Sequence, residues 1–471
     1  MSDEFLNTIK IVTIMIVRFI NRQIELNYLE EIASSPRAEL VVVYGRRRVG
    51  KTRLLLEFLK RRGGLYFYIP NGGKGTVLRS LSQVVEANFY PGFTFREFDE
   101  FLRYLSRWFT EHRGGVVVLD EFQNLSILKG AVSLLQKSWD EEYSRIGAKL
   151  ILAGSSVGII ECVSLRGDAP LYGRKTGVVE LEPLHPAYLA QWFPRLEHAK
   201  LVELYGVFGG TPAYLELVNP SRSVEDNVKR LILDKRGPLY REPEFLLMEE
   251  VRTPARYVDI LGAISQGKIT LSEISDYTGI SRENVTTYLA TLISMRLVAK
   301  ESTPTKKASR YTLTDPFFEF WFRFVLPNRP LLEHDLQNQV WEKIKQEYNA
   351  YLGRVFERIA RLHIASKIRK GELVIHPDYL GAWWDKDVEI DIVALSTRES
   401  KAVLFEAKWS TLTQKEARRI LESLIQKATT LPTHQNTYGL VAKDVYQKEK
   451  LLHEGFIVYT LSDIFNPNQS V

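Results

Sequence analysis

Residues 41–52 combine glycines, a lysine and a threonine at the spacing of a phosphate-binding loop. Their sequence, V-V-V-Y-G-R-R-R-V-G-K-T, fits G-x-x-x-x-G-K-[ST], between an apolar run of the strand type and a helical pattern. Glycines let successive backbone N–H groups surround phosphate oxygens, Lys51 would reach the β and γ phosphates, and Thr52 would bind Mg²⁺. A glycine loop of purely structural use is the alternative. The predicted nucleotide-binding residues are Gly45, Arg46, Arg47, Arg48, Val49, Gly50, Lys51, Thr52 and Arg53.

A second candidate is the apolar run V-V-V-L-D-E-F at 116–122, which ends in two carboxylates. Buried parallel strands have continuous apolar runs, and ligands collect beyond their carboxyl ends. We therefore expect Asp120 to hold the Mg²⁺ shell and Glu121 to polarise the attacking water. The alternative is a pair of exposed acids at a strand end.

A third apolar strand, K-L-I-L-A-G-S-S at 149–156, ends in paired serines. A polar group at this strand tip could lie near the γ-phosphate, and we favour Ser155 over Ser156. Solvent-facing serines of a turn are the alternative.

A separate group of acids and one lysine lies in E-I-D-I-V-A-L at 389–395 and F-E-A-K-W at 405–409. Side chains alternate between the faces of a strand, so Glu406 and Lys408 share one face, as do Glu389 and Asp391. Carboxylates and a lysine at one sheet edge can hold Mg²⁺ and place a water in line with a phosphodiester. A structural E-x-K on a solvated strand is the alternative.

Length and composition favour a globular protein of several domains. The 471 residues exceed one core, and roughly 100–200 residues per domain suggest three or four. The lone Cys162 excludes an internal disulfide and a cysteine-cluster zinc site. The net charge of +6 favours a polyanionic partner only weakly. The apolar run Ile11–Val17 is too short for a membrane helix, so we expect no membrane association and a cytoplasmic protein, whose true start could be Met15.

Alternating helix and strand patterns surround the phosphate loop. A helix capped by Asn21 is predicted over residues 19–32, with Ile24, Tyr28, Leu29 and Ile32 on one face. The next helix ends at Gly63-Gly64, and residues 65–69 form a strand. This order implies a mostly parallel sheet with helices on both faces.

The middle of the chain predicts a small helical lid over residues 185–250, which prolines cut into short helices. A helix ended by Gly267 then precedes a helix-turn-helix pattern, with helices at 271–277 and 281–295 around Thr278-Gly279 and a cap at Ser281. A hairpin with strands near residues 297–299 and 311–313 completes a winged helix.

Two uses of this winged helix remain open. If it binds DNA, an exposed helix face would enter the major groove and the wing would contact phosphates. The alternative is a winged helix used only for packing between domains. The predicted major-groove residues are Arg282, Asn284, Thr286 and Thr287, and the predicted phosphate contacts are Lys306, Lys307 and Arg310.

The last part of the chain predicts a compact α/β unit. An aromatic helix, F-F-E-F-W-F-R-F-V, is expected to join domains. It is followed by a helix at 346–368, strands at 373–376, 388–395 and 402–408, and a helix at 414–428.

With these motifs the chain resembles the AAA+ class of P-loop ATPases, and more narrowly the archaeal ATPase family related to STAND signalling ATPases and origin-recognition initiators. The resemblance implies that Arg174 faces phosphate, in cis or toward a neighbouring subunit, and that residues 210–212, with Pro212, lie over the adenine. A surface cation and a first-turn proline are the respective alternatives. The supporting motifs are F-I-N-R-Q-I-E-L, Y-G-R-R-R-V-G-K-T, V-V-L-D-E-F-Q, L-A-G-S-S, P-L-Y-G-R-K-T-G and F-G-G-T-P-A-Y-L.

The acids and lysine of the last part are similar to the PD-(D/E)xK nuclease superfamily, although Ile390 replaces the proline. This resemblance implies metal binding by Asp391, Glu406 and Glu357, with Lys408 stabilising charge on the attacked phosphate. A decayed nuclease fold used only for binding is the alternative.

The predicted fold class is therefore α/β: a P-loop NTPase core (15–184), a helical lid (185–250), a winged helix (251–330) and a restriction-endonuclease-like domain (331–471). The predicted function is an ATPase that uses ATP, ADP and Mg²⁺ and controls action on DNA, or on RNA. The alternatives are a nucleotide-dependent signalling switch that self-associates into a homo-oligomer, with an inert C-terminal domain, and a DNA-binding ATPase without nuclease activity.

Overall fold

The computed structural model describes residues 19–155, 171–304, 309–385, 388–429, 431, 433 and 435–466. The chain divides into two compact units, Met1–Pro183 and Leu184–Val471. The further division of residues 185–471 into three domains stays a prediction. Cys162 and Met15 lie outside the described residues.

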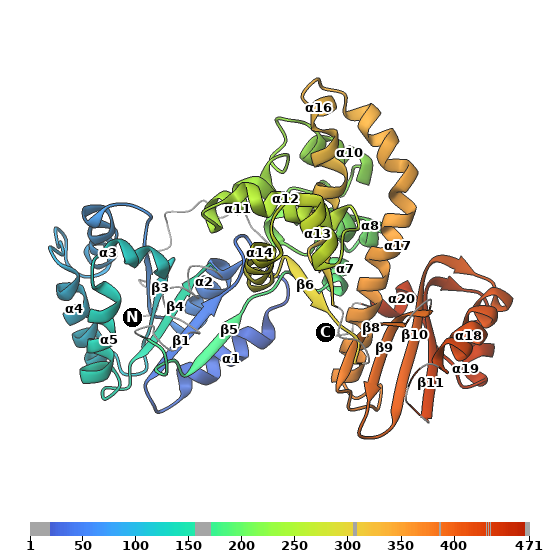
Figure 1. Ribbon diagram of the computed structural model, residues 1–471. Helices are drawn as coiled ribbons and strands as arrows, with labels where there is room; N and C mark the ends of the chain where they lie inside the picture. Colours follow the sequence, from blue (N-terminus) through green and yellow to red (C-terminus); the bar gives the residue numbers. More distant parts are fainter. Residues whose placement is uncertain are drawn as a thin grey trace. The chain divides into compact units, whose positions relative to one another are not determined.

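The first unit is built on a five-stranded sheet with the order β2-β3-β4-β1-β5, in which all neighbouring strands are parallel (Figure 1). The predicted mostly parallel sheet is confirmed. Its strands are β1 (Glu39–Tyr44), β2 (Leu65–Tyr68), β3 (Val116–Asp120), β4 (Lys149–Gly154) and β5 (Gly177–Glu180).

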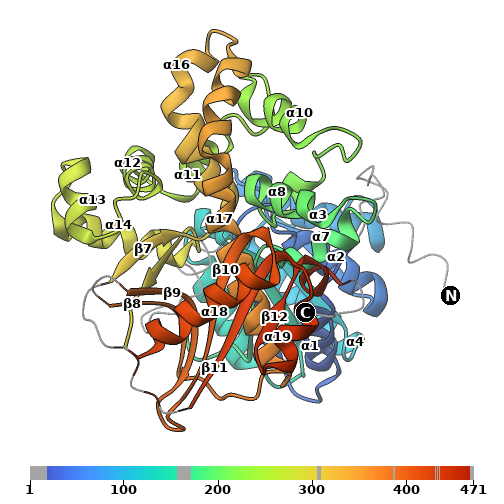
Figure 2. The same ribbon diagram turned by 90° about the vertical axis from the view of Figure 1, so that its right-hand side faces the viewer.

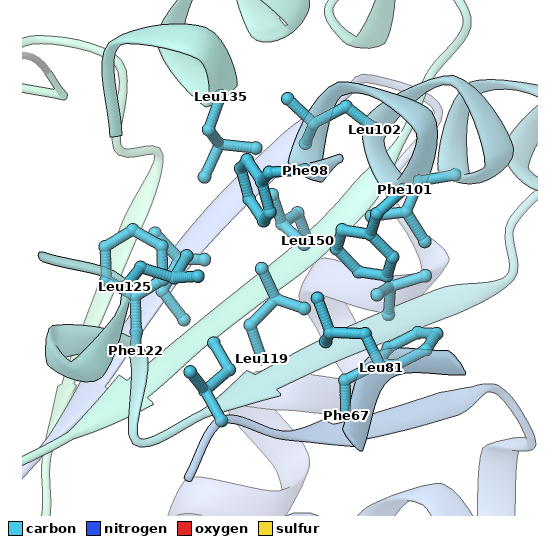
Figure 3. Close-up of a cluster of buried hydrophobic side chains, with 14 of the residues drawn as sticks. Phe67, Leu81, Phe98, Phe101, Leu102, Leu119, Phe122, Leu125, Leu135 and Leu150 are labelled. Carbon is cyan, nitrogen blue, oxygen red and sulfur yellow. The ribbon is translucent and has the colours of Figure 1, made fainter. Parts of the chain in front are cut away.

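Helices cover both faces of this sheet and make two cores. Odd-numbered residues of β2 and β3, such as Phe67 and Leu119, pack with Phe98 and Phe101 on one face (Figure 3). Even-numbered residues, such as Val118, pack with Leu54 on the other face. The helices are α1 (Gln23–Ser34), α2 (Lys51–Arg62), α3 (Lys74–Asn88), α4 (Phe98–Glu111) and α5 (Ala131–Ser138), with short turns η2 (Phe122–Ile127) and η3 (Trp139–Tyr143).

The predicted cap of the first helix was wrong. Arg22, not Asn21, is the N-cap of α1, and both residues have left-handed φ angles of 76° and 64°. Of the predicted apolar face, Leu29 is buried and Tyr28 and Ile32 pack against the core, whereas Ile24 is 65% exposed and Leu26 is buried in its place. The chain enters the helix through these two left-handed residues, which shifts the start by one position.

The second unit begins with short helices separated by prolines, as predicted. They lead into the predicted helix-turn-helix, where Gly279 ends the first helix with φ 67°. The elements are η4 (Pro186–Tyr188), α7 (Leu189–Trp192), α8 (His198–Phe208), α9 (Pro212–Leu215), α10 (Val224–Val228), η5 (Lys229–Leu233), α11 (Glu242–Glu250), α12 (Pro254–Ser265), α13 (Leu271–Thr278) and α14 (Arg282–Ser294).

A two-stranded antiparallel hairpin of β6 (Val298–Glu301) and β7 (Arg310–Leu313) follows α14, so the predicted helix-turn-helix with a wing is present. Thr270 and Glu273 form a capping box at the start of α13, which the sequence reading missed. Ser281 is the N-cap of α14, but its side chain makes no cap hydrogen bond.

The second sheet has the order β12-β11-β10-β9-β8, and its strands lie side by side in Figure 1. The predicted strand at 373–376 was wrong: this segment is irregular, Val374 is 85% exposed, and the first strand of the sheet is β8. The elements are β8 (Tyr379–Asp385), β9 (Val388–Ser396), β10 (Lys401–Leu412), α18 (Gln414–Ala428), β11 (Gln435–Val445), α19 (Lys448–His453), β12 (Ile457–Tyr459) and α20 (Leu461–Ile464).

The helix α17 (Gln337–Arg369) joins the parts of the second unit (Figures 1 and 2). Its Tyr351 hydroxyl lies 2.5 Å from the carbonyl oxygen of Gly206 in α8 and 3.0 Å from that of Pro316. Further along, Phe356 packs against Trp409 of β10. The aromatic segment before it comprises α15 (Pro316–Phe320), η6 (Trp321–Val325), η7 (Leu326–Asn328) and α16 (Arg329–Leu332).

Within the described ranges, no helix combines the length and the apolar character that crossing a membrane requires.

We predict that Tyr351→Phe lowers the free energy of unfolding by about 1–3 kcal/mol, because a buried carbonyl loses its donor. Tyr348→Phe on the same helix is the matched control. The Tyr348 hydroxyl is buried without a hydrogen-bond partner among the described residues, so its loss breaks no hydrogen bond and should not lower stability. Urea unfolding followed by circular dichroism measures both, and equal effects would contradict the assignment.

Candidate functional site

Three strand ends of the first unit meet at one edge of the parallel sheet. β4 lies between β3 and β1, with Tyr44 opposite Gly154 and Leu119 opposite Leu152. The loop after β1, the acids after β3 and Ser155 after β4 therefore lie at the same edge. This is the edge at which parallel sheets bind ligands.

The loop after β1 has the backbone that its glycines allow. Gly45 and Gly50 have φ angles of 158° and 100°, and a Cβ on Gly45 would lie 2.3 Å from the carbonyl oxygen of Leu181. The helix α2 begins at Lys51, so its N-terminus lies at the loop. The buried Lys51 ammonium donates to the carbonyl oxygens of Gly45 at 2.8 Å and Arg46 at 3.2 Å.

The arginines of the loop differ in exposure. Arg46 is buried, Arg47 and Arg53 are half-buried, and Arg48 is exposed with a left-handed φ of 67°. Val49 packs its side chain into the core beside Leu54, so only its backbone can face a ligand.

Asp120 is fully buried and accepts hydrogen bonds from three elements. Its Oδ2 accepts from the Thr52 hydroxyl at 2.7 Å and from the Tyr66 hydroxyl at 2.6 Å, and its Oδ1 accepts from the backbone N–H of Glu121 at 2.9 Å. The contact of Thr52 with Asp120 is the arrangement that a Mg²⁺ site between a loop hydroxyl and a strand-end carboxylate requires. These residues therefore fit the metal that the sequence predicted.

Arg22 is a site residue that the sequence reading missed. Its buried guanidinium donates to the carbonyl oxygens of Val49 at 3.3 Å and Glu182 at 2.5 Å, and it pairs with Glu25 at 3.0 Å. It thus ties the phosphate loop to the segment after β5. No local signal distinguishes this arginine from a surface cation at a helix start.

The other residues predicted around the nucleotide have different positions. Ser155 is buried at the ligand edge. Glu121 follows β3 with a φ of 56°, and its carboxylate accepts from Gln123 at 2.5 Å. Pro212 is the first-turn proline of α9 in the second unit, so its contact with adenine stays a prediction. Ser156 lies outside the described residues.

Arg174 lies at the opposite edge of the sheet. Thr176, two residues later, donates its N–H to the carbonyl oxygen of Leu40 at the start of β1, which is about 15 Å of strand away from the loop. The Arg174 guanidinium pairs with Asp140 at 2.7 Å and lowers the pKa of that carboxyl. This position argues against a contact of Arg174 with phosphate bound in the same chain. The contact toward a neighbouring subunit is the prediction that remains.

The second unit brings together the acids and the lysine of β9 and β10. The Lys408 ammonium lies 2.8 Å from Glu406 Oε2 and 3.3 Å from Asp391 Oδ2. The backbone N–H of Ala407 also donates to Asp391, at 2.8 Å. Lys427 of α18, which the sequence reading missed, pairs with the other oxygen of Glu406 at 2.8 Å.

Burial and neighbouring charges shift the pKa values of these acids in different directions. Burial, with the charge of Glu406, raises the pKa of Asp391. Burial opposes ionisation of Glu406, but the ammonium groups of Lys408 and Lys427 outweigh it and lower the pKa. Burial, with the charge of Asp391, raises the pKa of Glu357 on α17 to about 7.

The described part of the chain contains no group of three or more His, Cys, Asp or Glu side chains arranged to hold a metal ion. In the second unit, lysine ammonium groups occupy the Glu406 oxygens that a metal would need. Metal binding by Asp391, Glu406 and Glu357 therefore stays a prediction that requires these lysines to move.

One face of the winged helix is exposed, and its hairpin contacts the second sheet. Arg282, Asn284, Thr286 and Thr287 are exposed on α14, as the DNA-binding reading requires. Arg310 of β7 instead pairs with Glu389 of β9 at 3.0 Å and lies 4.3 Å over the Trp384 ring. It packs the wing against the second sheet, and its expected phosphate contact stays a prediction. Lys306 and Lys307 lie outside the described residues.

Three family models match the chain. Residues 19–218 match an ATPase domain predominantly from Archaea, residues 253–308 match the MarR family, and residues 321–420 match a family of archaeal and bacterial proteins of unknown function. The matches cover the P-loop core, the helix-turn-helix with β6 of its wing, and α17 with the strands β8 to β10.

Two proteins and a solved structure are among those similar to this chain. An uncharacterized ATP-binding protein of Methanocaldococcus jannaschii is 49% identical over 47 residues, 10% of this chain and 80% of its own length. The crystal structure of Cdc6p from Pyrobaculum aerophilum covers 68% of this chain and 96% of its own, with 13% identity and a TM-score of 0.32. An uncharacterized protein of the same Methanocaldococcus is 32% identical over 438 residues, 92% of this chain and 97% of its own length. The chain therefore belongs to a family of archaeal ATPase-domain proteins.

Proposed function

We propose that this protein is a Mg²⁺-dependent ATPase whose nucleotide state controls a second unit that acts on nucleic acid. The observation that supports it best is the contact of Thr52 with the buried Asp120 beside the Lys51 loop. The match of residues 19–218 to an ATPase domain agrees with this geometry. We propose a cytoplasmic location, because both ATP and DNA are available there.

Each group at the ligand edge has a role that follows from its position. Lys51 exchanges its two loop carbonyls for phosphate oxygens, since an ammonium group pairs more strongly with a charged acceptor. Thr52 and Asp120 hold the magnesium, which would neutralise phosphate charge when bound. Glu121 orients and deprotonates the attacking water, and Ser155 contacts the γ-phosphate from the neighbouring strand end.

Arg174 is proposed to act in trans. It lies at the edge of the sheet opposite the phosphate loop, so the phosphate it meets belongs to a second copy of the chain. A guanidinium supplied to a neighbouring site stabilises charge in the transition state. This proposal requires a nucleotide-dependent homo-oligomer.

The second unit is proposed to bind DNA through α14. Its exposed residues include one arginine and one asparagine that can reach base edges, Arg282 and Asn284. The match of residues 253–308 to the MarR family supports a winged helix here. Cleavage would then use Asp391 and Glu406, with Lys408 beside the attacked phosphate.

A second candidate function is a nucleotide-dependent DNA-binding or signalling switch whose C-terminal sheet is inert. The ion pairs of Glu406 favour it: Lys408 and Lys427 each pair with one of its carboxylate oxygens. Glu406 therefore has no oxygen open to a metal unless a lysine moves.

We expect Lys51→Ala to weaken ATP binding at least about tenfold and to abolish phosphate release, because a charge-assisted contact to phosphate is lost. Lys60→Ala, an exposed lysine of the same helix, should leave both unchanged. Calorimetry measures binding and phosphate release measures turnover. Wild-type protein that takes up no ATP, or a Lys51→Ala variant that binds normally, would refute the ATPase assignment.

If the C-terminal sheet cleaves nucleic acid, Asp391→Ala and Lys408→Ala should each reduce cleavage at least about 100-fold. Lys401→Ala, at the exposed start of β10, is the matched control and should cleave as the wild type does. DNA and RNA substrates are incubated with ATP and Mg²⁺ or Mn²⁺ and resolved by gel electrophoresis. Equal cleavage by all four proteins, or none by any, favours the inert switch.

Glu357 gives a pH test that separates the two candidates. Its pKa is raised from 4.5 to about 7 in the folded protein, so the native state holds the proton more tightly. Stability should therefore fall as pH rises from about 4.5 to about 7. Relative to the wild type, the free energy of unfolding of Glu357→Gln should increase by on the order of 1 kcal/mol across this window. It should stay higher by that amount at higher pH.

Urea unfolding at several pH values measures this difference, with Glu342→Gln, an exposed glutamate of the same helix, as the control. A cation bound beside Glu357 stabilises its carboxylate, so added Mg²⁺ should shrink the gain if the site holds metal. A stability gain of Glu357→Gln that does not change with Mg²⁺ favours the inert domain. A gain that does not depend on pH would contradict the raised pKa.

A further inference from the structure

Tyr66 lies on the strand next to β3, on the face that carries α2. Leu65 and Phe67 point into the core on the opposite face, while Tyr66 packs with Val116 and Val118. Asp120 has the same parity as Val116 and Val118, so alternation places its side chain on the face of Tyr66. The tyrosine ring therefore approaches the carboxylate from a different element than Thr52 does.

The register of the two strands explains why the hydroxyl reaches Asp120. Tyr66 is opposite Val118, so Asp120 is its diagonal neighbour, two residues further along β3. Diagonal neighbours lie about 7–8 Å apart, within reach of an aromatic side chain. The resulting O–O distance of 2.6 Å is that of a hydrogen bond to a charged acceptor.

Three donors limit how the Asp120 carboxylate can turn. Oδ2 accepts from Thr52 and Tyr66, and Oδ1 accepts from the N–H of Glu121. An ionised carboxylate has about four lone-pair positions, so one position on Oδ1 remains. A carboxylate only accepts hydrogen bonds, so the Tyr66 hydroxyl is the donor in this pair.

We propose that Tyr66 is a positioning residue for magnesium: its hydroxyl holds the Asp120 carboxylate in the orientation in which the remaining lone pair would serve the magnesium site. This inference rests on the proposed ATPase function and adds a residue to it. Tyr66 acts through Asp120 and touches neither nucleotide nor metal. Its loss should therefore affect metal use and leave nucleotide binding without metal intact.

Tyr66→Phe keeps the ring and removes only the hydroxyl. We expect the Mg²⁺ concentration that half-saturates ATP hydrolysis to rise about tenfold, the effect of one hydrogen bond to a charged group. The affinity for a slowly hydrolysed ATP analogue in EDTA should stay within about twofold of the wild type, since no phosphate donor changes. Calorimetry with EDTA and with Mg²⁺ measures both affinities.

Tyr104→Phe is the matched control, because the Tyr104 hydroxyl is buried without a hydrogen-bond partner in the described part of the chain. Thermal unfolding verifies that each variant is folded. In an Asp120→Asn background the further change Tyr66→Phe should have no effect on Mg²⁺ dependence, because the anionic acceptor is already gone.

An unchanged Mg²⁺ requirement in Tyr66→Phe, or an equal loss of affinity with Mg²⁺ and with EDTA, overturns the inference while leaving the ATPase assignment intact. An additive effect in the Asp120→Asn background also overturns it. Wild-type protein that binds no nucleotide under either condition would instead remove the function on which the inference rests.

Discussion

The buried charge of Asp120 is the constraint on which the first unit depends. An ionised carboxylate without exposed surface is stable only when donors replace its lost water. Here Thr52 comes from the helix after the phosphate loop, Tyr66 from the neighbouring strand, and a backbone N–H from the turn beyond β3. The order of the strands, the start of α2 and the turn at Glu121 must all be correct for these donors to meet. The same geometry leaves one lone pair of the Asp120 carboxylate without a donor.

The second unit satisfies its buried acids in a different way. Glu406 is paired with two ammonium groups, and Asp391 with one ammonium and one backbone N–H. Lysines can leave when a stronger cation arrives, whereas hydroxyl and backbone donors remain beside a metal. The donors of the first site can thus remain beside the proposed magnesium, while the acids of the second site are neutralised by their own lysines. Arg310 adds a further link, since it joins the wing to β9 and β8.

Much of the fold could be read from local patterns. Continuous apolar runs predicted β1, β3 and β4 because strands buried on both faces have no polar side, and glycines predicted where α2 and α13 end. The missed features have non-local causes. The start of α1 depends on the bonds of Arg22 to Val49 and Glu182, and residues 373–376 have a strand-like composition without a partner strand.

The sequence by itself determined the phosphate loop, the two acids at the end of β3, and the common strand face of Glu406 and Lys408. Each of these follows from the spacing of residues along one element. Only the tertiary structure decided which groups from distant elements meet these residues. Tyr66 on Asp120, Lys427 on Glu406 and Arg174 at the far edge of the sheet all depend on strand order and register. Those properties arise from packing between segments far apart in the chain, which no local pattern encodes.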